Sequence, residues 1–75
     1  MNFKREAIAA FSTKTRRDRR RALLTILEQI TAIRNDEEQY MINVPESLRC
    51  TESYALAENA VSVLDDIIDM IGDVY

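Results

Sequence analysis

Hydrophobic residues recur at helical spacing in the first eleven residues of the chain. Phe3, Ala7, Ile8 and Phe11 follow an i, i+4, i+5, i+8 pattern, which predicts a short amphipathic helix. A polar run, Ser12 to Thr15, then interrupts the pattern, and Thr13 or Thr15 can cap the helix that follows. We therefore expect an N-terminal amphipathic extension over residues 1–13 and a helical hairpin over residues 14–75.

The second segment covers about residues 15–42, and its apolar positions alternate in steps of three and four. This heptad-like spacing is typical of a coiled coil and predicts a row that faces another helix. The row consists of Leu23, Ile26, Ile30, Ile33, Tyr40 and Val44. Glu37 occupies the missing place in the row. Three roles stay open for it: pairing with Arg34, capping the end of the helix, or setting the register of the bundle.

A turn is predicted over residues 43–52, because Pro45 disfavours helix at the residue before it. Thr51 or Ser53 then serves as the N-cap of a third segment, which Gly72 ends or frays.

The third segment, about residues 53–71, carries two apolar rows rather than one. The first row is Tyr54, Ala57, Val61, Leu64, Ile68 and Ile71. The second row is Leu56, Ala60, Val63, Ile67 and Met70. Together they cover about half of the helix circumference, which predicts contact with two neighbours.

The predicted fold is all-α: an antiparallel helical hairpin with a short N-terminal helix, assembling into a homo-oligomeric helical bundle. In this hairpin the first row faces the preceding helix, with Ile30 near Leu64 and Ile26 near Ile68. The N-terminal helix or another protomer covers the second row, which we take as the self-association surface.

Composition narrows the function. A chain of 75 residues holds one small domain, whose core is marginal without a partner. It contains no His, one Cys (Cys50) and one Gly, so the usual general base, an internal disulfide and a glycine-rich phosphate loop are all missing. We expect no enzyme activity, no cofactor and no metal. No apolar run approaches ~18 residues, and the first residues do not resemble a signal peptide, so we expect the cytoplasm and no membrane.

Charge is divided unevenly along the chain. Residues 1–34 hold nine basic and three acidic side chains, and residues 35–75 hold one basic and ten acidic side chains. An antiparallel hairpin brings Arg16 to Arg21 to the same end as Asp69 and Asp73. Ion pairing at that end is therefore the simplest explanation of the uneven charge. The alternative is a binding site for nucleic acid, a nucleotide or another phosphate ligand. Its candidate residues are Lys14, Arg16, Arg17, Arg20 and Arg21.

Acidic side chains in the second half suggest a surface for a cationic protein partner, by electrostatic complementarity. The candidate residues are Asp36, Glu37, Glu38, Glu58, Asp65, Asp66 and Asp69. The spacing of Asp65, Asp66 and Asp69 also matches a D-D-x-x-D metal motif, but the chain is too short to enclose a substrate, and a solvated acidic face is the better interpretation.

Three motifs resemble small helical-hairpin proteins from phages and mobile elements of Gram-positive bacteria. They are Glu37-Glu38-Gln39-Tyr40, Asn43-Val44-Pro45-Glu46-Ser47-Leu48, and the run from Glu52 to Val61. A fainter similarity, in Pro45-Glu46-Ser47 and in the run from Ala55 to Ala60, is to hairpin modules of phage proteins that sequester cyclic nucleotides. The first resemblance implies a helical hairpin in the cytoplasm of a bacterial host cell and points to no catalytic activity. We expect a non-enzymatic interaction protein that acts as a stoichiometric inhibitor of a host defence complex through its acidic face. The second implies an oligomer with basic residues around a ligand.

Overall fold

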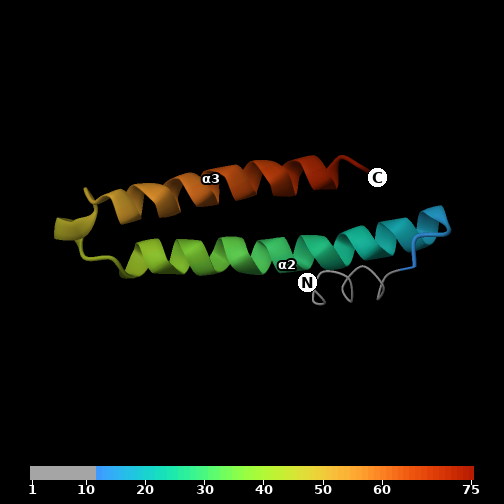
Figure 1. Cartoon of the computed structure of the whole chain (residues 1–75), viewed down its shortest axis with the longest axis horizontal. Coiled ribbons are helices and arrows are strands. Elements are labelled where there is room, and N and C mark those ends of the chain that lie inside the picture. Colours follow the sequence, from blue (N-terminus) through green and yellow to red (C-terminus); the bar gives the residue numbers. More distant parts are fainter. Residues whose placement is uncertain (1–11) are drawn as a thin grey trace, which may run out of the picture.

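The computed structural model describes residues 12–75, and this part of the chain is helical throughout apart from its turns. α2 runs over Arg16–Asn43, a short 3-10 helix η1 over Glu46–Leu48, and α3 over Glu52–Gly72. α2 and α3 lie side by side and antiparallel (Figure 1). The all-α hairpin is therefore confirmed for these residues. The amphipathic helix predicted for residues 1–11 lies outside them.

Threonine hydroxyls begin both long helices, as the sequence predicts. The Thr15 hydroxyl accepts a hydrogen bond from the backbone N–H of Asp18 at 3.0 Å. The Thr51 hydroxyl accepts one from the backbone N–H of Tyr54 at 3.4 Å. Each cap satisfies a backbone donor that has no partner within its helix.

The turn between the helices spans Val44 to Thr51 and holds itself with local contacts. The backbone N–H of Leu48 donates to the carbonyl of Pro45 at 2.9 Å. The Arg49 side chain donates through Nε to the carbonyl of Val44 at 3.3 Å and lies 6.0 Å from the centre of the Tyr54 ring. These contacts fix the length of the turn, and with it the register of α2 against α3.

The first row of α3 faces α2, as predicted, but only part of the predicted α2 row faces α3, because Leu23, Ile30 and Val44 are half-buried and the other members are exposed. Ile33 is 56% exposed and Tyr40 is 47% exposed. The half-buried positions between the helices are Leu23, Leu27, Ile30, Arg34 and Met41. The apolar arc of α2 is wide enough for two rows, and a single neighbour covers only one of them. The predicted seam is therefore wrong for Ile26, Ile33 and Tyr40.

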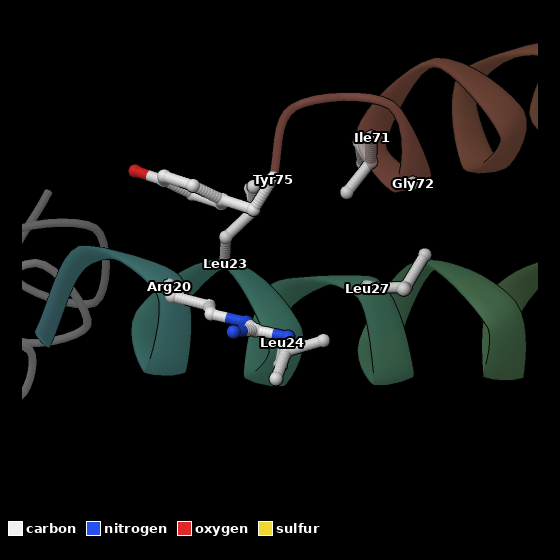
Figure 2. Close-up of a pocket in the computed structure, with 7 residues that line it drawn as sticks. All are labelled: Arg20, Leu23, Leu24, Leu27, Ile71, Gly72 and Tyr75. Atoms are coloured by element: carbon white, nitrogen blue, oxygen red, sulfur yellow. The ribbon is translucent and has the colours of Figure 1, made fainter. Parts of the chain in front are cut away.

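The register also differs from the predicted one. Leu27 lies beside Ile71, and Leu23 lies beside Tyr75, around a cavity at the open end of the hairpin (Figure 2). Farther along, Arg34 bonds to Asp65. The prediction places Ile30 at this height of α3, whereas the structure places Arg34 there. α2 is therefore shifted along α3 by about one helical turn relative to the predicted register.

The hairpin has little interior of its own. Within residues 12–75, the only buried side chains are Ala22 and Ala57. Two helices in contact along one line leave every larger apolar side chain partly open to water. In the same range, neither α2 nor α3 has a stretch apolar enough, over sufficient length, to cross a bilayer.

Candidate functional site

One side of the hairpin carries apolar side chains from both helices. Tyr40 of α2 lines a shallow groove together with Leu56 and Ala60 of α3. Ile26 and Ile33 lie fourteen and seven residues before Tyr40, so they share its side of α2. Val63, Ile67 and Met70 continue the row of Leu56 and Ala60. We call this surface the apolar face; it consists of Ile26, Ile33, Tyr40, Leu56, Ala60, Val63, Ile67 and Met70.

The part of the apolar face on α3 is the predicted self-association row, and it is open. Leu56 is 63% exposed, Met70 69% and Val63 46%. Ile67 is also exposed, and Ala60 is half-buried. A contiguous apolar surface on two adjacent helices marks an interaction site more specifically than scattered single side chains do.

The opposite side of the hairpin is held by a polar cluster that crosses between the helices. Arg34 Nε donates to Asp65 Oδ1 at 2.8 Å, and Nη2 donates to Asp65 Oδ2 at 3.5 Å. Arg34 also pairs with Glu38, one turn later on α2. Glu38 and Asp65 each lie two residues from a member of the apolar face, about 200° around their helices. The hairpin therefore has an apolar side and, opposite it, a polar side.

The hydrogen bond to Asp65 is the main reason that the pKa of Arg34 is raised above its ordinary value. The charges of Asp65 and Glu38 add to the rise, and partial desolvation of the guanidinium works against it. The bidentate geometry makes this contact a directional one. The i, i+4 spacing of Arg34 and Glu38 is visible in the sequence, but the bond to Asp65 follows only from the register.

The predicted acidic surface is divided between different environments. Glu38 and Asp65 are engaged by Arg34. Glu37 is half-buried beside Tyr40, at the edge of the apolar face. The remaining members are exposed: Asp36, Glu58, Asp66 and Asp69. On α3, Glu58, Asp65 and Asp69 share one stripe by their spacing.

The predicted basic residues gather at the start of α2 and are all exposed: Lys14, Arg16, Arg17, Arg20 and Arg21. The Arg16 guanidinium lies over the Tyr75 ring, 5.1 Å from its centre. Arg19 Nη1 donates to the carbonyl of Thr13 at 3.1 Å. Among residues 12–75, no ion pair joins these cations to the acidic residues of α3. The predicted pairing of opposite charges at the open end is therefore not made within the described part of the hairpin.

A cavity of about 160 Å³ lies beside the basic residues, between the ends of α2 and α3. Figure 2 shows its wall: Leu23 and Leu27 extend from α2 toward α3, Ile71 comes from α3, and Arg20 lies along the α2 side. Pockets that enclose small ligands usually reach ~300–1,000 Å³. This cavity within a single hairpin is therefore too small to enclose a nucleotide.

The other chemical groups do not gather into a site within residues 12–75. No three His, Cys, Asp or Glu side chains of this range meet at distances that suit a metal ion. Cys50 is exposed in the turn, and its thiol lies 3.9 Å from the carbonyl oxygen of Ser47.

Comparison of the chain with protein-family models, with curated protein sequences and with solved structures found no match.

Proposed function

We propose that this chain is a non-enzymatic interaction protein of the phage or mobile-element type, which acts by stoichiometric binding and self-associates into a helical bundle. The observation that carries the proposal is the apolar face. Residues 12–75 bury two alanines and carry eight apolar positions along one side, so a second polypeptide over that side would supply the core that this part of the hairpin lacks.

Exposed carboxylates supply the second part of the proposal, a cationic partner. Glu58, Asp66 and Asp69 lie on α3 without an ion pair among residues 12–75. Charges at the rim of an interface steer association and select the partner more than they add affinity. The target that we propose is a component of a host defence complex.

A pull-down from bacterial host lysate tests this function. The test variant is Asp66→Lys with Asp69→Lys, which leaves the bond between Arg34 and Asp65 in place. The matched control is Glu28→Lys with Asp73→Lys, which makes the same change in net charge at exposed positions outside the predicted acidic surface. We expect the wild type and the control to retain one cationic protein in a fixed ratio, and the test variant to lose it. Equal retention by both variants would contradict the proposal.

The alternative function is an oligomeric binder of a nucleotide or other phosphate ligand through Lys14, Arg16, Arg17, Arg20 and Arg21. The observation in its favour is that these side chains are exposed and not ion-paired to α3 in the described part of the chain. A cyclic nucleotide would then raise the melting temperature by mass action, and Arg17→Glu with Arg20→Glu would abolish the shift. No shift at millimolar ligand would exclude this alternative.

A further inference from the structure

We propose that two copies of this chain pair antiparallel through their apolar faces, with a two-fold axis that passes beside Ile33 and Val63. This inference rests on the self-association proposed above and adds the orientation and the residues at its centre. The pair is a four-helix arrangement in which the open end of one hairpin lies over the turn of the other.

The spacing of the two exposed rows is symmetric. Ile26 and Tyr40 lie seven residues on either side of Ile33, and Leu56 and Met70 lie seven residues on either side of Val63. Because Leu23 is level with Tyr75 and Leu27 with Ile71, Ile33 and Val63 differ by about two residues, or ~3 Å, in height along the hairpin. One axis midway between them, at right angles to the helices, therefore reverses each row onto itself to within about one residue, which a two-fold interface can accommodate.

The side chains that meet under this operation are complementary in size. Val63 meets Val63 of the second copy, and Leu56 meets Met70. Ala60 lies within one residue of the level of Ile67, so that a small residue is next to a large one. The same reversal on α2 places Ile33 against Ile33 and Ile26 against Tyr40. Close packing of this kind is what a stable helical interface needs.

Apolar spacing alone also permits a parallel pairing, in which the α3 row of one copy covers the α2 row of the other. Charge distinguishes the two. The open end, residues 12–24 and 69–75, holds six basic and three acidic side chains. The closed end, residues 36–58, holds one basic and six acidic side chains. Parallel pairing brings like ends together, whereas antiparallel pairing brings opposite ends together.

The antiparallel arrangement also provides carboxylates for the arginines at the start of α2. Because Leu23 is level with Tyr75, the residues before Leu23 extend beyond the end of α3. In the pair, this overhang lies over the turn of the second copy, where Glu46 and Glu52 are exposed. Opposite charges then meet between two chains rather than within one.

Residues 1–11 are the other candidate to cover the apolar face. As a helix they would be ~16 Å long, whereas each exposed row extends ~21 Å. Their amphipathic pattern supplies one row of four apolar positions, whereas the face consists of eight positions on two helices. A helix of this length would cover part of one exposed row, whereas a second copy of the chain would cover both rows.

Light scattering on the full chain tests whether copies associate. We expect the mass of a dimer at micromolar concentration and a melting temperature that rises with concentration. A monomer at ~100 μM, with a melting temperature independent of concentration, would overturn both the self-association and this inference, and would leave residues 1–11 to cover the face.

Disulfide trapping then tests the orientation alone. In a Cys50→Ser background, Val63→Cys and Ile33→Cys are each oxidised alone and as an equimolar mixture. Antiparallel pairing places each new thiol within a few ångströms of its own copy across the axis, and thermal motion brings such thiols to the ~3.5–4.5 Å between Cβ atoms that a disulfide needs. We expect covalent dimers from each single variant at least ~10-fold faster than from Ser62→Cys, a neighbouring exposed control.

Two results would overturn the antiparallel geometry while leaving self-association intact. Dimers that form only in the mixture of Val63→Cys and Ile33→Cys would show the parallel arrangement. A dimer by light scattering with no cross-link in any sample would show that another surface associates.

Discussion

The two apolar rows of α3 have nearly the same composition but opposite environments. The inner row, from Tyr54 to Ile71, lies against α2 and includes Ala57, which is 4% exposed. The outer row, from Leu56 to Met70, lies beside Tyr40 at Leu56 and Ala60. Its other members are exposed among the described residues: Val63, Ile67 and Met70. Periodicity predicts both rows equally well, but the number and position of the neighbouring helices decide which row is covered and which stays exposed.

The largest expected effect comes from a charge in the middle of the outer row. Val63→Asp places two carboxylates together at the proposed axis, and burying them without partners costs several kcal/mol. We expect the dissociation constant of the dimer to rise at least ~100-fold, measured by analytical ultracentrifugation. Ser62→Asp, one residue away on an exposed position, is the control and leaves the constant within a few-fold. Equal loss in both variants would place the interface elsewhere.

A smaller effect is expected from a larger side chain in the inner row. Ala57 is buried between the helices, so Ala57→Leu must push α2 and α3 apart at a cost of ~1–3 kcal/mol in the free energy of unfolding. Urea denaturation at fixed protein concentration measures it. Ala55→Leu, on an exposed position of the same helix, should stay within ~0.5 kcal/mol of the wild type. If the two variants behaved alike, the inner row would not be the core.

The cap of α3 should affect both rows together, because both belong to the same helix. Thr51→Ala removes the acceptor for the backbone N–H of Tyr54 and should cost ~1 kcal/mol, with dimer affinity falling in parallel. Ser53→Ala, two residues later, is the comparison and should change neither. Loss of affinity without loss of stability would show that the turn itself contacts the second copy.

The smallest effect is expected on the polar side. Arg34→Gln removes the ion pairs with Glu38 and Asp65, which are partly open to solvent, so the melting temperature should fall by only a few degrees, and by less at high salt. Because the pKa of Arg34 is raised, its contribution is complete below the unfolded-state pKa and is lost only as pH rises through the folded-state value, far into the alkaline range. The difference from the wild type should therefore be the same at about pH 7 and about pH 9. A difference that disappears between these values would contradict the assigned role.

Local signals predict much of this fold. Thr15, Thr51 and Gly72 mark helix ends, and the inner row of α3 follows from period alone. The row on α2 could not be predicted with the same success, because its arc accommodates two rows and the sequence does not say which one the neighbour takes. Arg34 with Asp65 could not be predicted for a related reason. Their contact depends on the register, and the register depends on the backbone path from Val44 to Thr51.

The candidate site was partly visible. The outer row of α3 was identified from its spacing, but Ile26, Ile33 and Tyr40 were assigned to the seam instead of beside it. The acidic and basic sets stay predictions, because their roles depend on a partner rather than on the packing of this chain.

The short turn and the thin interior together have a consequence for the folding pathway. An eight-residue connection closes quickly and at small entropic cost, so α2 and α3 can meet within microseconds of helix formation. Contact between the two helices alone buries few side chains among residues 12–75, so in the proposed dimer most of the stabilisation comes when a second hairpin binds. Refolding should therefore be second order in protein concentration, with the encounter between two loosely formed hairpins as its slow step.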